Sequence, residues 1–374
     1  MNNYRLFISA TALLLSRVAG YAQAGSPDSI VHTAATIYRA SPSFVGLSIG
    51  IYLDGKTYMY HFGERHKGAH DLPGDRTLYE IASITKTFTG TLLAKAVLEN
   101  RVKLDDDIRK YLDGDYPNLE YNGHPITVAG LLNHRSGIPY MLPQDSIYMT
   151  GSNEVQTLRQ LALYKHYTRQ DFFRDLHQVR LDALPGTKFR YSNAAAIICG
   201  IILEKLYGIG YEELLKRRLT AALKMRDTKI TLTAADRKRM AAGYDEKGVL
   251  MPGAPNQLQG AGAIKSTVSD MLKYIAWHLD EGHGAARLSH EPTWRSGDYW
   301  AGLNWQVIQS PGGQRLIWQS GDLAGYASYC ALYPGDHMGI VVLTNEEDRK
   351  APGLIEKLID QIAVSLKPDA PRFP

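Results

Sequence analysis

Ser83 and Lys86 form a Ser-x-x-Lys pair inside the stretch Ile81–Gly90, at the start of a predicted helix. Three residues span about one helical turn, so the two side chains can lie side by side on one face. A serine hydroxyl becomes a nucleophile when a neighbouring group takes its proton, and a lysine amine can do so when its environment keeps it neutral. The pair therefore predicts nucleophilic catalysis. The alternative is an N-cap serine beside a solvated lysine.

Ser48 is a second candidate nucleophile, because Gly46–Gly50 matches the G-x-S-x-G pattern of α/β-hydrolases. That motif requires a sharp strand-to-helix turn that exposes the serine. Here apolar residues alternate through Val45–Tyr52, and the hairpin signal Asp54-Gly55 follows. We therefore interpret the segment as a strand whose small residues face a closely packed neighbour.

Other chemically capable residues carry weaker signals. The 12 histidines show no H-x-x-x-H spacing on a helical pattern, so the sequence predicts no metal site and no cofactor. His134 precedes a Gly- and Pro-containing loop, which favours a structural role, and the acidic run Asp105–Asp107 is typical of a capped, solvated turn. Cys199 and Cys330 allow a disulfide, but their apolar surroundings favour buried thiols.

Length and composition fit a folded protein of one large or two ordinary domains. The 374 residues are 44% hydrophobic and 21% charged, which excludes a mostly disordered chain. The formal charge is +4; residues 1–24 hold Arg5, Arg17 and no acids, so a chain starting at Gly25 carries 4 − 2 = +2. There is no basic stripe with interleaved aromatic residues, and no nucleic-acid partner is expected.

The N-terminus predicts a signal peptide over residues 1–24. Arg5 precedes the apolar run Leu6–Leu15, and Ala22-Gln23-Ala24 resembles a cleavage site. A short membrane anchor is the alternative, although the run is too short to span a bilayer. We expect a periplasmic or secreted protein with no stable membrane span after signal removal.

Strands at both ends of the chain surround a helical middle. This order predicts an α+β fold, with an antiparallel sheet flanked by terminal helices and a large all-helical insertion. The sheet part would comprise about 25–80 and 272–374, and the helical part about 81–271, with the polar, tyrosine-rich segment Tyr140–Tyr167 as a lid over the cleft. The predicted strands are Val45–Tyr52, Lys56–Phe62, Tyr299–Gln309, Gln314–Gln319, Tyr326–Tyr333 and Gly339–Thr344, and the predicted terminal helices are Ser26–Ala40 and Leu354–Leu366.

The order of three motifs resembles the serine β-lactamase and penicillin-recognising superfamily. Ser83-x-x-Lys86 is followed by Tyr191-Ser192-Asn193 and, much later, by Gln319-Ser320-Gly321 before Asp322. The resemblance is to the branch of class C β-lactamases, D-alanyl-D-alanine carboxypeptidases, D-aminopeptidases and β-lactamase-like esterases, and covers about residues 30 to 345. It extends to further segments: Leu131–Pro139, Leu184–Gly186, Ala242–Tyr244, Gly260–Gly262 and Ser266–Asp270.

The resemblance implies a role for each motif residue. Ser83 would be the acylated nucleophile, and Lys86 and Tyr191 would share the work of general base and acid, in an order that the sequence leaves open. Asn193 would donate to the substrate and position Lys86. The backbone N–H groups of Ser83 and Asp322 would form the oxyanion hole.

The third motif departs from the family pattern. The family usually has Lys-Thr-Gly or His-x-Gly, whereas Gln319-Ser320-Gly321 supplies no positive charge for a substrate carboxylate. We expect an exported serine hydrolase acting on an ester, amide or peptide, with cell-wall peptides among the candidates, and with weak or no β-lactamase activity. Gln319, Ser320, Gly321 and Asp322 would contact this substrate. The alternative is a non-hydrolytic peptidoglycan- or peptide-binding or sensing protein that kept the fold.

Overall fold

The computed structural model describes residues 26–144, 150, 153–253, 255–347 and 353–374. The predicted signal peptide over residues 1–24 lies outside the described residues, as does part of the predicted lid, including Tyr148. In the described chain, no single helix has the length and apolar character needed to cross a membrane. Asn193–Tyr207 and Tyr211–Thr220 meet that test only as a pair bent by 75°.

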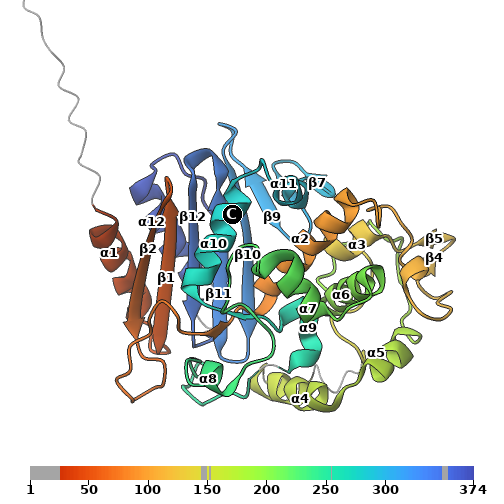
Figure 1. Ribbon diagram of the computed structural model, residues 1–374, viewed down its shortest axis with the longest axis horizontal. Helices are drawn as coiled ribbons and strands as arrows, with labels where there is room; N and C mark the ends of the chain where they lie inside the picture. Colours follow the sequence, from red (N-terminus) through yellow and green to blue (C-terminus); the bar gives the residue numbers. More distant parts are fainter. Residues whose placement is uncertain (1–25, 145–149, 151–152, 254, 348–352) are drawn as a thin grey trace, which may run out of the picture.

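A large antiparallel sheet organises the described chain (Figure 1). Its strands are β1 Gly46–Leu53, β2 Lys56–Gly63, β7 Trp294–Ser296, β8 Tyr299–Ala301, β9 Gln306–Gln309, β10 Arg315–Leu323, β11 Tyr326–Tyr333 and β12 Met338–Thr344. They run in the order β2-β1-β12-β11-β10-β9-β8-β7, and each neighbouring pair is antiparallel. The N-terminal hairpin therefore joins the C-terminal strand, as predicted for a sheet completed by both ends of the chain.

The β1–β2 hairpin follows from its turn and its small residues. Asp54 and Gly55 have φ values of 48° and 84°, which suit a tight turn between twisted strands. A Cβ atom on Gly50 would lie 2.7 Å from the Val268 side chain and 3.1 Å from that of Leu272. Both belong to helix α10 (Val268–Leu279), so the small face of β1 is closely packed, as the sequence predicted.

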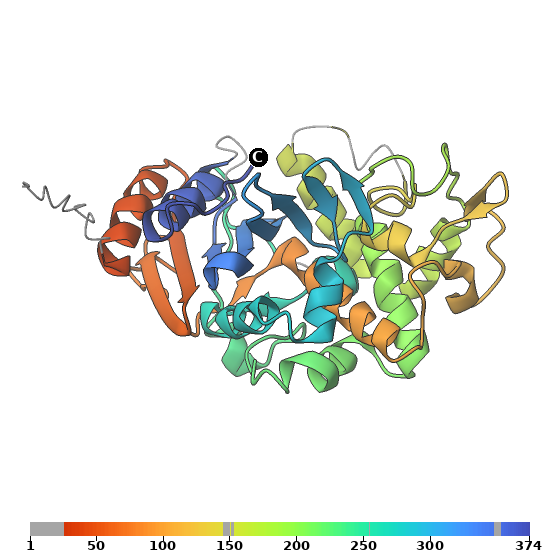
Figure 2. The same cartoon turned by 90° about the horizontal axis from the view of Figure 1, so that it is seen from above.

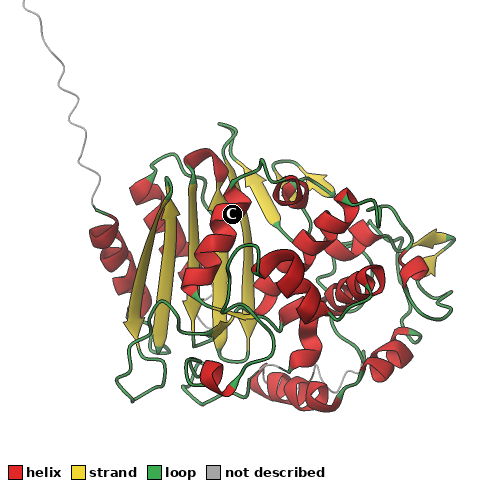
Figure 3. Cartoon of the chain, in the orientation of Figure 1, coloured by secondary structure: helices red, strands yellow, loops and turns green. Residues whose placement is uncertain are grey.

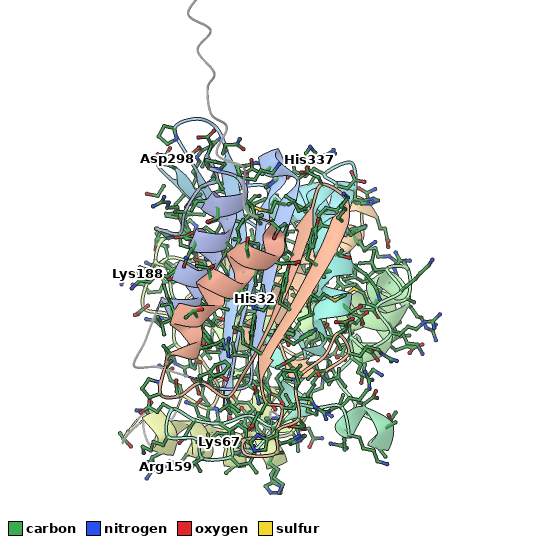
Figure 4. All side chains as sticks on the ribbon, turned by 90° about the vertical axis from the view of Figure 1, so that its left-hand side faces the viewer. His32, Lys67, Arg159, Lys188, Asp298 and His337 are labelled. Atoms are coloured by element: carbon green, nitrogen blue, oxygen red, sulfur yellow. The ribbon has the colours of Figure 1, made fainter. Side chains whose placement is uncertain are left out.

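Helices cover both faces of the sheet. Helix α1 (Pro27–Arg39) packs beside α12 (Leu354–Leu366) on one face, while α10 lies on the other (Figure 2). The face under α1 and α12 buries alternate residues of β1 and β12 in one apolar cluster. His32 of α1, labelled in Figure 4, packs edge-on against the Phe62 ring at 5.3 Å.

The other helices gather mainly beyond the β7–β10 side of the sheet, around α2 (Figure 3). Most of the α2 side chains are buried, and a Cβ atom on Gly90 would lie 2.1 Å from the Leu303 carbonyl oxygen. The helices are η1 Ala82–Ile84, α2 Thr85–Leu98, η2 Ile108–Tyr111, α3 Val128–Leu132, α4 Asn153–His166, α5 Arg169–Leu176, α6 Asn193–Tyr207, α7 Tyr211–Leu215, η4 Lys216–Thr220, α8 Ala234–Arg237, η5 Asn256–Leu258, α9 Gln259–Gly262, α11 Gly284–His290 and η6 Pro334–Asp336. Two small sheets pair β3 Tyr79–Glu80 with β6 Lys265–Ser266, and β4 Glu120–Tyr121 with β5 His124–Pro125.

Several predicted boundaries were wrong. The predicted strand Tyr299–Gln309 is two strands, because the chain turns between them, with the Gly302 N–H donating to the Trp305 carbonyl at 2.9 Å and φ at +61° for Asn304. The short strand β7 was missed. Strand β10 runs on to Leu323, four residues beyond its predicted end, and so carries the whole Gln319-Ser320-Gly321 motif.

Candidate active site

Ser83 lies in a tight helical turn that places it beside the sheet. The 3-10 helix η1 precedes α2, so Ser83 stands one residue before the cap of the α-helix rather than inside it. Ser83 and Lys86 lie three residues apart across the junction of the two helices, which is about one turn and brings Ser83 over Lys86. Ala82 has a φ of +45°. This left-handed conformation is unfavourable for a residue with a Cβ atom, and such conformations are often found at functional sites.

Lys86 is fully buried beneath the partly exposed Ser83. Its Nζ donates to Ser83 Oγ at 2.9 Å and to the Ala261 carbonyl at 2.7 Å. Burial disfavours the charged ammonium and lowers the pKa of Lys86 from 10.5 to about 7. Near neutral pH, a large fraction of Lys86 is therefore a neutral amine in contact with the serine oxygen.

Tyr191 reaches the same serine oxygen from the segment before α6. Its hydroxyl lies 2.7 Å from Ser83 Oγ, and Lys86 Nζ lies 5.0 Å from the ring centroid. Burial raises the pKa of Tyr191, with smaller contributions in the same direction from Tyr140 and Asp322. The following residue, Ser192, caps α6 by accepting from the Ala195 N–H, so the helix start fixes where Tyr191 points.

His134 packs behind Tyr191. The two ring centroids are 4.3 Å apart, and the Ser192 N–H donates to His134 Nδ1 at 3.2 Å. Burial, reinforced by the nearby Lys86, lowers the pKa of His134 to about 3, so the imidazole is neutral. These contacts are to the tyrosine segment, in agreement with the structural role predicted for His134.

Strand β10 carries the third motif, Gln319-Ser320-Gly321, and packs directly against the helical turn that holds Ser83. A Cβ atom on Gly321 would lie 2.6 Å from the Ser83 nitrogen and 2.7 Å from the Ile81 carbonyl oxygen. Ser328, opposite Gly321 on β11, donates from Oγ to the Ile81 carbonyl at 2.9 Å. Glycine is thus required for this approach, which sets the edge of β10 beside the Ser83 N–H.

Gln319 lies behind the cleft wall rather than in it. The residue is 4% exposed; its amide Nε2 donates to the Asn304 carbonyl at 2.9 Å, and its Oε1 accepts from the Ser320 N–H at 3.0 Å. Asn304 in turn donates from Nδ2 to the Lys86 carbonyl at 3.0 Å. The substrate contact expected for Gln319 is absent from this arrangement, because both ends of its amide already bind backbone groups of the described chain.

A narrow cleft of about 70 Å³ opens over Ser83. Asn193 and Asp322 line it, as predicted, whereas Gln319, Ser320 and Gly321 are not among its lining residues. Asp322 is the one lining residue in the described chain with a formally charged side chain. The remaining lining residues are Ala82, Tyr140, Met141, Gln160, Leu161, Tyr164, Pro255, Ala261, Gly262 and Leu323.

Ser48 has the hydrogen-bond partners of a nucleophile, but a substrate has no access to it. Its Oγ lies 2.9 Å from His61 Nδ1 and 2.8 Å from the Tyr79 hydroxyl, and His61 Nε2 lies 2.9 Å from Asp75 Oδ1. Ser48 is completely buried in the middle of β1, so a substrate carbonyl cannot reach it. The strand interpretation of Gly46–Gly50 is confirmed, and the hydrogen bonds hold Tyr79, four residues before Ser83.

The other candidate groups are structural where the chain is described. No three or more His, Cys, Asp or Glu side chains of the described residues are placed to hold a metal ion. In the acidic run, Asp106 accepts from the Lys103 N–H and Asp107 from the Arg109 N–H, so the run is a capped turn. Cys199 and Cys330 are both buried free thiols.

The sequence did not reveal two groups that hydrogen-bond to Lys86, one from Asn304 and one from Ala261. Asn304 escaped notice because it lies inside the segment that was predicted as one continuous strand. Ala261 contributes a backbone carbonyl, which no side-chain pattern reveals, although the segment Gly260–Gly262 was among those that carried the family resemblance. Leu161 and Tyr164 line the cleft. Tyr164 was among the tyrosines of the segment predicted as a lid, whereas Leu161 was not singled out.

Comparisons with known proteins agree with this fold. The family model described as beta-lactamase matches residues 33–363. The chain is 24% identical to a "Beta-lactamase" of Escherichia coli (strain K12), over 89% of this chain and 93% of that protein. It is 26% identical to the "D-alanyl-D-alanine-carboxypeptidase/endopeptidase AmpH" of the same organism, over 82% and 71%. A solved β-lactamase/D-alanine carboxypeptidase from Yersinia pestis superposes with a TM-score of 0.78 at 24% identity, over 91% of this chain and 98% of that chain.

Proposed function

This chain belongs to the beta-lactamase family, and from that premise we propose that it is a serine hydrolase whose nucleophile is Ser83. One observation carries the proposal: Lys86 Nζ and the Tyr191 hydroxyl converge on Ser83 Oγ, at 2.9 and 2.7 Å. This is the arrangement that nucleophilic catalysis needs, with a base in hydrogen-bond contact and a second proton carrier beside it.

Lys86 is the base of the acylation step. With a pKa of about 7 it holds a free lone pair at neutral pH, whereas the raised pKa of Tyr191 keeps the phenol protonated. The Ser83 proton moves to Lys86 Nζ as Ser83 Oγ bonds to the substrate carbonyl carbon. Tyr191 then gives its proton to the departing alcohol or amine and takes one back from Lys86.

The carbonyl oxygen becomes negative as the tetrahedral intermediate forms. The N–H groups of Ser83 and Asp322 bind it, because Gly321 lets β10 approach the Ser83 nitrogen closely. The intermediate collapses to an acyl-enzyme on Ser83. Water then attacks this ester, with the same two side chains moving the protons in reverse, and Ser83 is released.

The substrate is an ester, amide or peptide that does not depend on a carboxylate. Among the described residues of the cleft lining, none supplies a positive charge, and Asp322 adds a negative one. Gln319, at the position where the family places a cation, is neutral and turned into the interior. Weak or absent β-lactam turnover follows, since a β-lactam presents a carboxylate to this wall.

A peptide substrate derived from the cell wall is compatible with the comparisons and the N-terminus. One curated relative is named as a D-alanyl-D-alanine carboxypeptidase and endopeptidase, which supports hydrolysis of an amide. The predicted signal peptide over 1–24 would export the enzyme to the periplasm or beyond. A non-hydrolytic binding or sensing protein is the second candidate function, favoured by the neutral Gln319.

Labelling and turnover with matched variants test the proposal. A fluorophosphonate probe is expected to label the wild type and Ser48→Ala, but not Ser83→Ala. p-Nitrophenyl esters, D-amino-acid amides and peptides, and a chromogenic cephalosporin then define the substrate class. Correctly folded wild type that neither labels nor turns over any of them would establish the binding protein instead.

The variant Gln319→Lys tests the role of the missing charge. An ammonium group is costly to bury, so the new side chain is expected to turn from the interior toward the cleft. We expect it to raise cephalosporin or D-alanyl peptide turnover at least tenfold over wild type, provided that its melting temperature shows a folded protein. Rapid cephalosporin hydrolysis by the wild type would overturn the specificity argument while leaving the nucleophile unchanged.

A further inference from the structure

A second and larger cavity lies beside the catalytic cleft and has no part in the mechanism above. It encloses about 410 Å³ and is lined by residues of α4, α5 and α6, which lie close together in Figure 1. Ile197, Ile201 and Phe172 give it an apolar wall. Its charged lining includes Arg169 and Glu204, which pair with each other. The cavity therefore offers an apolar interior with a polar end.

Helix α6 forms a common floor for the cleft and the cavity. Asn193 lines the cleft, while Ile197, Ile201 and Glu204 line the cavity. Steps of four, four and three residues keep these four side chains on one face of the helix. From Asn193 to Glu204 the helix rises 11 × 1.5 Å, or about 16 Å. A long group that leaves the cleft along this face would pass directly into the cavity.

Tyr164 of α4 stands between the two spaces. It is the one side chain in the described residues that lines both of them. The residue is 3% exposed, its hydroxyl donates to the Leu142 carbonyl, and its ring centroid lies 5.1 Å from that of Tyr167. One hydrogen bond and one ring contact thus position the group that divides the cleft from the cavity.

We propose that the cavity is a subsite for a long, unbranched apolar acyl chain, and that Tyr164 determines access to it. The inference rests on the proposed hydrolase function, which supplies an acyl group on Ser83. The cleft of about 70 Å³ accommodates a short acyl group alone, whereas a cavity of about 410 Å³ with one apolar wall takes a chain of many methylene groups along that wall. Each buried methylene group contributes about a fourfold gain in affinity.

The test compares esters that differ only in the acyl chain. The measured quantity is kcat/KM for p-nitrophenyl decanoate divided by kcat/KM for the butanoate, below micelle-forming concentrations. Tyr164→Ala is expected to raise this ratio at least tenfold. Ile197→Trp fills the cavity from its floor and is expected to lower the wild-type ratio at least tenfold and to cancel the gain in the double variant.

Leu161→Ala is the matched control, since Leu161 lies one turn before Tyr164 on α4 and lines only the cleft. It is expected to change the ratio less than threefold. A Tyr164→Ala ratio equal to wild type, or an Ile197→Trp substitution that leaves the ratio unchanged in both backgrounds, would overturn the subsite. If Ile197→Trp does not fold, Ile201→Phe replaces it as the filling variant.

A binding measurement separates failure of the subsite from failure of the hydrolase function. A fluorescent long-chain fatty amide, which carries no carboxylate, is titrated into Ser83→Ala, which cannot form an acyl-enzyme. Saturable binding that Ile197→Trp abolishes supports the subsite even if no ester is turned over. Binding that persists unchanged in that variant, or no binding in either protein, overturns it.

Discussion

At the scale of the residue, the site depends on a lysine without a counter-ion. Lys86 is fully buried, and its described hydrogen-bond partners are the hydroxyl of Ser83 and the carbonyl of Ala261, neither of which carries charge. Burial alone therefore lowers its pKa to about 7. A carboxylate in place of the Ala261 carbonyl would have kept the Lys86 ammonium charged, and Lys86 would then not accept a proton from Ser83.

This environment predicts the pH dependence of acylation. Below pH 7 Lys86 is protonated, so kcat/KM for a neutral ester should fall about tenfold per pH unit and reach a plateau above pH 8. Lys86→Met should lower kcat/KM by roughly 10² to 10⁴-fold and remove the inflection. Initial rates between pH 5.5 and 9 measure both effects. His134, with a pKa lowered to about 3, stays neutral throughout this range. A flat profile across pH 7 would contradict the assignment of Lys86 as base.

Residue types and their order made Ser83, Lys86, Tyr191 and Asn193 predictable. The direction in which a side chain points was not predictable in the same way. Gln319 turns inward because Asn304 presents a carbonyl to it, and that carbonyl exists there only because the chain turns before β9. A sequence motif gives the order of its own residues. It does not show which groups a turn elsewhere in the chain places beside them.

At the scale of the element, the contact between β10 and η1 sets the geometry of the nucleophile. The Gly321 position leaves no room for a side chain between Ser83, Ile81 and Ser328. Ser328 Oγ also bridges the carbonyls of Ile81 and Gly321, at 2.9 and 3.2 Å. The strand and the 3-10 turn are thus held together by backbone approach and one shared hydroxyl.

Gly321→Ala should therefore damage activity more than stability. Its Cβ atom would lie 2.6 Å from the Ser83 nitrogen, so the turn and the strand must separate. We expect fluorophosphonate labelling of Ser83 to slow at least 100-fold and the free energy of unfolding to fall by about 1–3 kcal/mol. Gly312→Ala is the control, because its Cβ atom would meet only the Ser310 side chain, at an ordinary contact distance of 3.8 Å. Labelling of Gly321→Ala at the wild-type rate would refute the steric argument.

Elements with strong periodicity were predictable and short ones were not. Strand β11 and helix α12 have the bounds that the sequence predicts, since each pairs a clear pattern with Gly- and Pro-containing ends. The two-residue strands β3 and β6 are too short to show a period. They exist because the tertiary fold brings Glu80 beside Lys265, which sequence alone does not reveal.

At the scale of the whole molecule, a chain of polar groups, buried at its two histidines, links the sheet to the catalytic helix. Arg315 of β10 pairs with Glu281 at 2.7 Å, and Glu281 lies 3.3 Å from His290 Nδ1. His290 Nε2 lies 3.1 Å from His278 Nδ1, and His278 Nε2 lies 3.2 Å from Thr91 Oγ1 on α2. Because only one proton fits between the two facing nitrogens, the two rings cannot both be charged, and burial favours the neutral form of each.

The stability of the fold should therefore depend on pH through His278 and His290. Burial lowers the pKa of both, so the unfolded chain, with a histidine pKa of about 6.5, binds more protons than the fold below that pH. The free energy of unfolding that the two neutral histidines contribute is fully present above pH 6.5. It is lost as pH falls, by up to about 1.4 kcal/mol per pH unit for each histidine. Glu281, with a pKa lowered to about 2, keeps its contribution until pH falls below about 4.5.

Urea unfolding of wild type and His278→Gln at pH 7.5, 6.0 and 5.0 measures this dependence. His278→Gln should be less stable at pH 7.5, because the amide replaces the ring contacts imperfectly, yet should lose only about two-thirds as much free energy of unfolding between pH 6.0 and 5.0, because His134 and His290 still take up protons on unfolding. His124→Gln changes an exposed histidine of β5 and should follow the wild-type slope. Equal slopes for all three proteins would show that the buried pair does not govern the acid sensitivity of the fold. A flatter slope in His278→Gln alone would place that sensitivity at the contact between α10 and α11, next to the helix that carries Lys86.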